Sequence, residues 1–229
     1  MSDEAHDHLA LSRRNLLLGS AALLAAQACR APSAAAPFAS HVGGDEAKMD
    51  QFVADCVAAE AEGERQAAVQ EVLARGVSDP RAMLSAAGEP VRAGIKVFHR
   101  SSTLTIFAAA WTPQMNLMPH NHEMWALIGL YTGREDNILW RRSDDGVTAY
   151  GADALFEGDV GVLPETAIHS VTNPLPRFTS GIHIYGGDFF ETTRSQWDPE
   201  TREESPSDGD RIRKIFERAN ERYEGSERG

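Results

Sequence analysis

The sequence predicts a mainly β domain, either a sandwich or a barrel, with helical segments on both sides of it. Two observations support this fold class. Short runs rich in β-branched and aromatic residues follow one another through the middle of the chain, and Gly, Pro, Asn and Asp separate them. Patterns of helical spacing precede and follow these runs. The expected strands cover residues 91–99, 103–111, 125–131, 137–142, 148–156, 160–163, 167–171 and 178–185.

Length and charge limit what the chain can be. Its 229 residues, 42% of them hydrophobic, are enough for one domain with appendages and a substantial core. The formal net charge is −12 and the sequence has no basic patch, so we expect no nucleic-acid partner. The sequence leaves the oligomeric state open.

The N-terminus carries a predicted export signal over residues 1–36. Arg13 and Arg14 precede an apolar run from Leu16 to Ala28, which resembles a twin-arginine signal peptide. The run is shorter than the roughly 20 residues that a membrane span needs, so we expect no stable membrane span in the mature protein. The sequence therefore predicts export through the twin-arginine pathway to the periplasm.

The two cysteines add one alternative and one exclusion. Ala26-Gln27-Ala28-Cys29 faintly resembles a lipoprotein cleavage box, so a lipid anchor at Cys29 is a minor alternative. Cleavage after Ala36 leaves Cys56 as the only cysteine of the mature protein, which excludes an intramolecular disulfide. Cys56 lies on an apolar helical stripe, where a buried core thiol is expected.

Residues 37–90 are expected to form a linker, extending to Gly44, and then a helical segment. Apolar residues recur there at helical spacing, and Gly63 is expected to divide the pattern into two helices. Asp79 followed by Pro80 predicts the start of a short third helix, because aspartate caps helices well and proline is tolerated in the first turn.

Residues 191–229 are expected to form a polar tail and a C-terminal helix. The tail is interpreted as an extended excursion over the surface. The helix has one apolar face, which predicts that it docks on the domain, although a partner-binding helix is also possible. The residues of this face are Ile212, Ile215, Phe216, Ala219 and Tyr223.

Three histidines form a candidate metal site. His120 and His122 point the same way on an extended strand, because side chains alternate between faces, and His169 follows in a later strand. Neutral imidazole binds iron, copper, nickel and zinc, and three such ligands leave positions open for substrate or oxygen. The alternative for the His-x-His pair alone is a strand with two surface histidines.

Four motifs occur in order in the β-rich region: residues 119–129 (PHNHEMWALIG), Gly133 with Glu135, residues 168–174 (IHSVTNP) and residues 182–188 (IHIYGGD). Together they resemble the thiol dioxygenase cupins, most closely the bacterial cysteine dioxygenase-like enzymes that include 3-mercaptopropionate dioxygenases. The resemblance spans residues 91–197. It implies a cupin fold, the double-stranded β-helix or jelly-roll barrel, with the metal-binding barrel at residues 91–190.

The resemblance also implies roles for individual residues. His120, His122 and His169 would hold ferrous iron. Many cupins add a glutamate ligand shortly after the second histidine, but those positions are apolar here, and Glu123 faces away by alternation. His183 and Tyr185 share a face and match the catalytic histidine and tyrosine beside the metal. The alternative for this pair is a core histidine and a barrel-lining tyrosine.

Three further positions bear on the substrate and on the branch of the family. Arg194 matches the family's carboxylate-binding arginine, with a solvated tail arginine as the alternative. Gly181 stands where the family has the serine of a Ser-x-His-x-Tyr relay, and Ser180 faces the opposite side. Leu127 occupies the place of the cysteine that mammalian-type enzymes cross-link to tyrosine, which favours the bacterial branch.

The function implied is the oxidation of a small thiol, such as 3-mercaptopropionate or cysteine, by O2 to its sulfinate at a three-histidine Fe(II) centre. Two other hypotheses remain. The chain could be a cupin that uses another metal for non-redox catalysis, or a metal-dependent ligand-binding protein without turnover. Metal analysis and an oxygen electrode distinguish the three.

Overall fold

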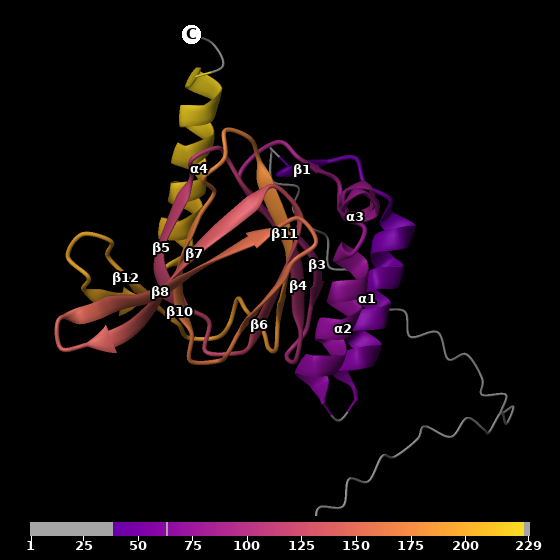
Figure 1. The fold of residues 1–229 in the computed structure, drawn as a ribbon, viewed down its shortest axis with the longest axis horizontal. Helices are drawn as coiled ribbons and strands as arrows, with labels where there is room; N and C mark the ends of the chain where they lie inside the picture. The colour runs from indigo at the N-terminus through magenta and orange to yellow at the C-terminus, as the bar shows by residue number, and fades with distance from the viewer. Residues whose placement is uncertain (1–38, 63, 227–229) are drawn as a thin grey trace, which may run out of the picture. The chain divides into compact units, whose positions relative to one another are not determined.

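The computed structural model describes residues 39–226 except residue 63. In this part of the chain antiparallel strands form two large sheets, and helices pack against them (Figure 1). The predicted signal peptide, the alternative anchor at Cys29 and the first two residues of the predicted linker lie outside the described residues.

The two sheets have five and six strands. In order, the first contains β3 (Gly94–Arg100), β4 (Thr105–Trp111), β11 (Thr179–Tyr185), β6 (Ala126–Thr132) and β9 (Val160–Leu163). The second contains β13 (Glu204–Pro206), β12 (Ser195–Trp197), β5 (Asn116–Asn121), β10 (Ile168–Thr172), β7 (Arg134–Ser143) and β8 (Gly146–Phe156).

The strand order defines the fold. The eight central strands run β4-β11-β6-β9 in one sheet and β5-β10-β7-β8 in the other. Numbered along the chain, this is the order of an eight-stranded jelly roll, in which the chain crosses between two antiparallel sheets after every strand except β7, whose successor β8 pairs with it. The chain therefore has the double-stranded β-helix of the cupins, as the sequence predicted.

Alternation along each strand produces two cores. On β4, Ile106 and Ala108 face the helices that cover the five-stranded sheet, whereas Phe107 and Ala109 face the barrel interior. The same alternation on β11 places Ile184 on the helix side. The barrel interior therefore receives every second side chain of the strands.

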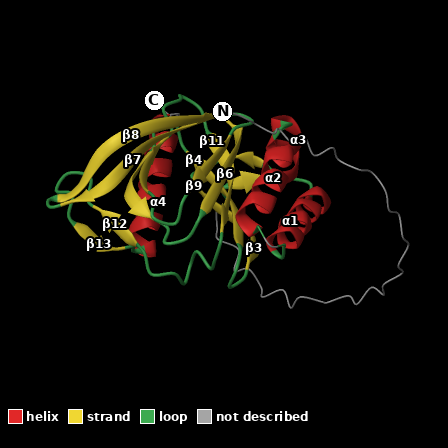
Figure 2. Cartoon of the chain, turned by 60° about the horizontal axis from the view of Figure 1, so that its bottom comes forward, coloured by secondary structure: helices red, strands yellow, loops and turns green. Residues whose placement is uncertain are grey.

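Three helices cover the outer face of the five-stranded sheet, as Figure 2 shows: α1 (Glu46–Glu60), α2 (Arg65–Val77) and α3 (Pro80–Ala87). Asp79 caps α3 by accepting from the backbone N–H of Ala82, which confirms the predicted start. A Cβ at Gly129 would lie 2.6 Å from Leu73, so only glycine lets α2 pack this closely on β6. None of the described helices is long and apolar enough to cross a membrane.

Cys56 of α1 is fully buried in this helical layer, and burial raises the pKa of its thiol to about 12. It is a core residue, as predicted, because a thiol so hard to ionise is a poor nucleophile.

The C-terminal helix α4 (Gly209–Ser226) docks on the barrel through its apolar face, as predicted. Phe216 stacks on Trp111 with 5.4 Å between ring centroids, and Tyr223 meets Phe178 edge-on at 4.9 Å. Asn220 both accepts from and donates to the backbone of Ala93. These contacts join the end of the chain to the start of its β region.

The linker prediction is wrong at its end. Residues His41–Val42 form strand β1, which pairs with β2 (Glu89–Pro90). The side chain of His41 is buried, and its Nε2 lies 3.0 Å from Ser180 Oγ and 3.1 Å from Tyr131 Oη. A strand of two residues has too little pattern to be found in the sequence, because its pairing partner is far away in the chain.

The tail prediction is also wrong. Residues Ser195–Trp197 and Glu204–Pro206 are not a surface excursion but strands β12 and β13, which extend the six-stranded sheet beyond β5. Trp197 is completely buried. This pairing places Arg194 next to the strand that carries His120.

Candidate metal centre

The three predicted ligand histidines come together inside the barrel. His120 is the last residue but one of β5, His122 directly follows the strand, and His169 on β10 pairs with His120 across the sheet. One ring nitrogen from each lies within 4.8 Å of the others, and the ring centroids are 4.6 to 5.1 Å apart. The geometry matches the alternation that the sequence predicted.

Burial keeps these imidazoles neutral. It is the main cause of the lowered pKa of all three, and it brings that of His120 to about 4. His122 Nε2 and His169 Nε2 lie only 3.4 Å apart. Neutral nitrogens gathered in a buried pocket are a suitable donor set for a transition-metal cation, so the residues fit a metal ion.

Hydrogen bonds orient two of the three rings. His120 Nδ1 lies 2.9 Å from the carbonyl oxygen of Met118, and His169 Nδ1 lies 2.6 Å from Asn137 Oδ1. Both oxygens accept, so each Nδ1 carries the hydrogen and each Nε2 keeps a free lone pair. The third ring, that of His122, has a buried Nδ1 without a hydrogen-bond partner in the described residues.

The described cluster contains no carboxylate. Ala126 and Leu127, where many cupins have a glutamate ligand, are buried apolar residues. Glu123 has a left-handed backbone, with φ of 54°, and its exposed carboxylate accepts from Asn121 Nδ2. Glu123 therefore stays outside the cluster, as predicted.

His183 and Tyr185 both lie in the barrel beside the cluster. His183 Nδ1 is 3.3 Å from Tyr185 Oη, and the Tyr185 ring meets the His122 ring edge-on with 4.9 Å between centroids. Burial lowers the pKa of His183 to about 3 and raises the pKa of Tyr185, so both are neutral at pH 7. The pair therefore offers a hydroxyl group to the space next to the three imidazoles.

Arg194 is a half-buried cation near the same cluster. Its guanidinium lies 3.8 Å from the centroid of the Phe189 ring, and its buried Nε has no hydrogen-bond partner. No described carboxylate forms an ion pair with it. Burial is the main cause of the low pKa of His120 and His122, and the positive charge of Arg194 lowers both further.

Glu135 is a part of the site to which the sequence assigned no role. Its side chain is completely buried and accepts from Trp111 Nε1 and Asn137 Nδ2, both at 3.1 Å. Its Oε2 also lies 3.9 Å from His183 Nε2. Burial raises the pKa of Glu135 to about 7. The expected strand began at residue 137, whereas β7 begins at Arg134. An earlier strand start would have placed Glu135 and Asn137 on the same face, which was the only signal in the sequence for a role of Glu135.

Position 181, where the resembled family has its relay serine, is a glycine in a tightly packed part of β11. A Cβ there would lie 3.1 Å from the carbonyl oxygen of Gly129. Ser180 faces the other side of the sheet, as predicted, where it contacts His41 and donates to the carbonyl oxygen of Ala109 at 2.6 Å. Ser180 therefore cannot replace the missing serine.

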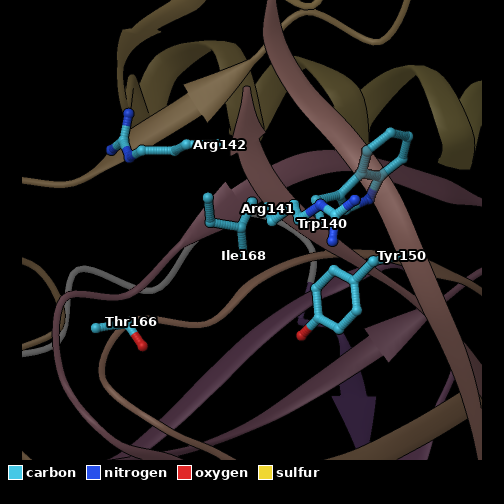
Figure 3. A pocket seen from close by; sticks show the side chains of 6 residues that line it. All are labelled: Trp140, Arg141, Arg142, Tyr150, Thr166 and Ile168. Atoms are coloured by element: carbon cyan, nitrogen blue, oxygen red, sulfur yellow. The ribbon is translucent and has the colours of Figure 1, made fainter. Parts of the chain in front are cut away.

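A surface recess of about 540 Å³ lies elsewhere, as Figure 3 shows. Ile168 and Trp140 pair across β10 and β7, and their side chains lie on the opposite face of the sheet from His169. None of the three imidazoles lines this recess, so it is separate from the metal centre. Its lining residues are Trp140, Arg141, Arg142, Tyr150, Thr166 and Ile168.

No protein-family profile and no curated protein matches this chain. Solved structures do resemble it. An uncharacterised protein with a double-stranded β-helix domain from Klebsiella pneumoniae is 14% identical, with a TM-score of 0.32, and the match covers 54% of this chain and 88% of that one. The cupin domain of Schizosaccharomyces pombe Cnp3 is 8% identical, with a TM-score of 0.34, and the match covers 42% of this chain and 62% of that one.

An oxalate oxidase is 15% identical, with a TM-score of 0.33, over 37% of this chain and 42% of that one. All three TM-scores are low, so the assignment to the cupin fold depends on the strand order. The chain therefore has a cupin fold, and its three-histidine cluster is a candidate metal centre.

Proposed function

We propose that this protein is a thiol dioxygenase that oxidises a small thiol with O2 to its sulfinate. The observation that carries the proposal is the combination of three neutral imidazoles, without a carboxylate ligand, beside a phenol and an unpaired guanidinium. A three-nitrogen site leaves positions for two reactants, which oxidation of a thiol by O2 requires. The motifs of the four sequence segments support the same proposal.

The reaction adds both oxygen atoms of O2 to sulfur, so that R–SH and O2 give R–SO2H. No external reductant is needed, because the sulfur supplies the four electrons. His120, His122 and His169 would hold the ferrous ion, which supplies the redox chemistry when bound because it can bind a thiol and O2 together. The product lies on the irreversible part of the thiol oxidation ladder.

Arg194 would bind the acidic end of the substrate. A guanidinium binds a carboxylate through two parallel hydrogen bonds, and no carboxylate of the described residues pairs with Arg194. Its contact with the Phe189 ring leaves it held at one place near the imidazoles. A substrate fixed at its carboxylate presents its sulfur in one pose, which favours 3-mercaptopropionate-like or cysteine-like thiols.

Tyr185 would contact the reactants. The His183–Tyr185 pair is neutral and buried, so the hydroxyl group can hydrogen-bond to the thiol substrate without an ionisation step. The buried Phe107 and the half-buried Phe189 pack on the Tyr185 ring and limit the access of bulk water. We also propose that the chain is exported through the twin-arginine pathway and works in the periplasm.

The same donor set would suit zinc, since three histidines bind zinc in some hydrolytic enzymes. A non-redox cupin and a binding protein without turnover are therefore the outcomes against which the proposal is tested. Iron-loaded protein is mixed with 3-mercaptopropionate, cysteine or cysteamine in an oxygen electrode. Thiol-dependent uptake with sulfinate formation supports the proposal; no uptake with any thiol, by protein shown to contain iron, would overturn it.

A further inference from the structure

Glu135 connects two parts of the site that have separate tasks. Its Oε1 accepts from Asn137 Nδ2, and Asn137 in turn holds the ring of His169. Its Oε2 accepts from Trp111 Nε1 and lies 3.9 Å from His183 Nε2. The Glu135 carboxylate therefore contacts Asn137, which holds the proposed ligand His169, through one oxygen. Its other oxygen lies near His183, the hydrogen-bond partner of Tyr185.

The first connection fixes the orientation of the Asn137 amide. An ionised carboxylate can only accept, so when Glu135 is ionised the Asn137 atom that faces it must be the NH2 group. The amide oxygen then faces His169, and an oxygen can only accept, so His169 carries its hydrogen on Nδ1. This leaves the Nε2 lone pair of His169 free to point into the cluster.

The second connection favours the opposite tautomer for His183, with the hydrogen on Nε2. His183 Nε2 is buried and has no hydrogen-bond partner, while the Oε2 atom of Glu135 lies 3.9 Å away. A carboxylate at this distance favours the tautomer with hydrogen on Nε2, and a movement of about 1 Å would complete the hydrogen bond. Nδ1 of His183 then has the lone pair and accepts the Tyr185 O–H at 3.3 Å.

This direction of hydrogen bonding decides what Tyr185 can do. With its hydrogen donated to His183, the phenol oxygen can only accept from a ligand placed beside His122. The site is then suited to a reactant that brings a hydrogen-bond donor, such as a thiol S–H or a hydroxyl group. If the hydrogen bond between Tyr185 and His183 ran in the opposite direction, Tyr185 would donate to the ligand instead.

Burial of a carboxylate here is costly and needs a reason. Glu135 is completely buried, and no described lysine or arginine forms an ion pair with it. Trp111 and Asn137 satisfy it only with neutral donors. Burial raises the pKa of Glu135 to about 7, so ionised and protonated forms both occur near neutral pH.

We propose that Glu135 is a positioning residue that sets the tautomers of His169 and His183 together, and thereby makes Tyr185 a hydrogen-bond acceptor toward the ligand. The effect of this on turnover rests on the proposed function. The tautomers themselves do not, because they can be read without any reaction.

The test compares Glu135→Gln with Asp136→Asn. Asp136 is the next residue of β7, so Asp136→Asn removes the same charge as Glu135→Gln. The Asp136 side chain, however, lies on the other face of the strand, where it pairs with Arg134. Glutamine keeps the shape of Glu135 and has only one acceptor oxygen. One of its three neighbours, Trp111, Asn137 or His183, must then face an N–H.

Nitrogen-15 spectra of histidine-labelled, zinc-loaded protein report the tautomers, and zinc serves as a diamagnetic probe. Ring assignments come from single histidine variants. We expect Nδ1–H for His169 and Nε2–H for His183 in the wild type and in Asp136→Asn. In Glu135→Gln the amide NH2 replaces one of the two carboxylate oxygens. If it faces His183, that ring should change to Nδ1–H; if it faces Asn137, the Asn137 amide should turn over and the zinc dissociation constant should rise about tenfold.

Unchanged His183 together with unchanged zinc affinity in folded Glu135→Gln would overturn the proposal. So would Nδ1–H for His183 in the wild-type protein at pH 8, a measurement that needs no variant and remains decisive if Glu135→Gln does not fold. Oxygen uptake separates this proposal from the proposed function. If the wild-type protein takes up no oxygen, the dioxygenase fails while the tautomers still decide the role of Glu135.

Discussion

Gln196 pairs with His120 across the edge of the six-stranded sheet, and this pairing brings the C-terminal part of the chain to the metal centre. The register fixes β12 against the ligand-bearing strand β5. Arg194, two residues before Gln196, then lies over the Phe189 ring with a buried Nε that has no partner. The tail thus supplies a cation that could orient an acidic substrate.

Arg194→Ala should therefore weaken the binding of acidic thiols. Loss of a charge-assisted hydrogen-bond pair costs about 1.5 to 3 kcal/mol, so KM for 3-mercaptopropionate or cysteine should rise roughly ten- to a hundredfold. Cysteamine, which has no carboxylate, should be nearly unaffected. Arg177→Ala, at an exposed ion pair with Glu157, is the control. Equal losses on all three thiols would place Arg194 in the structure and not in the binding site.

Tyr185→Phe should separate metal binding from turnover. The variant keeps the ring against His122 and loses only the hydroxyl that lies 3.3 Å from His183 Nδ1. We expect the metal content to be unchanged and thiol-dependent oxygen uptake to fall roughly ten- to a hundredfold. Tyr150→Phe on the exposed face of β8 is the matched control. Wild-type uptake by Tyr185→Phe would remove this hydroxyl from the mechanism.

His41 should make the stability of the protein depend on pH. Its ring lies among Ser40, Tyr131 and Ser180, and burial, followed by the charge of Lys96, lowers its pKa from 6.5 to about 4. The unfolded chain then binds a proton between pH 6.5 and 4 that the folded chain does not. The stabilising contribution is present above pH 6.5 and is lost as the pH falls toward 4, by up to about 3 kcal/mol.

Urea denaturation of metal-free protein at several pH values measures this loss. His41→Gln cannot titrate, so its free energy of unfolding should fall less than that of the wild type between pH 7 and pH 4. The other buried histidines are common to both proteins and cancel in the comparison. Parallel pH curves would show that His41 is not the titrating group.

The export prediction can be tested on the intact chain. Changing Arg13 and Arg14 to Lys should retain the protein in the cytoplasm with its N-terminal segment uncleaved, because a twin-arginine signal is recognised through its paired arginines. Fractionation and mass measurement of the purified product give the answer. Cytoplasmic, full-length wild-type protein would mean that the apolar run after Arg14 has another role.

The sequence predicted the parts of this fold that depend on regular local patterns. The alternation around His120 and His122 placed both on one face, and the cap at Asp79 gave the start of α3 correctly. The contribution of His169 also followed from its strand. These features depend on residue spacing, which can be read along the chain.

The parts that escaped prediction depend on pairing between distant segments. Strands β1, β12 and β13 are only two or three residues long, and each exists because a partner strand lies beside it. The network around Glu135 joins β4, β7, β10 and β11, and no local pattern specifies such a meeting. The sequence contained Glu135 within a motif, but its burial became visible only in three dimensions.

The metal site itself is tested by removing one ligand. His169→Ala leaves two imidazoles, which hold an ion weakly, so iron should be lost from the purified protein. His99→Ala is the control, since His99 is a partly buried histidine of β3 outside the cluster. Full iron occupancy in His169→Ala would show that the three imidazoles are not the ligands.

Oxygen-18 labelling tests the central claim most directly. Iron-loaded protein is supplied with 3-mercaptopropionate or cysteine under ¹⁸O2, and the product is examined by mass spectrometry. The account predicts a sulfinate in which both oxygen atoms carry the label, formed with one O2 consumed per thiol. A disulfide, a sulfinate labelled from water, or no product at all would contradict it.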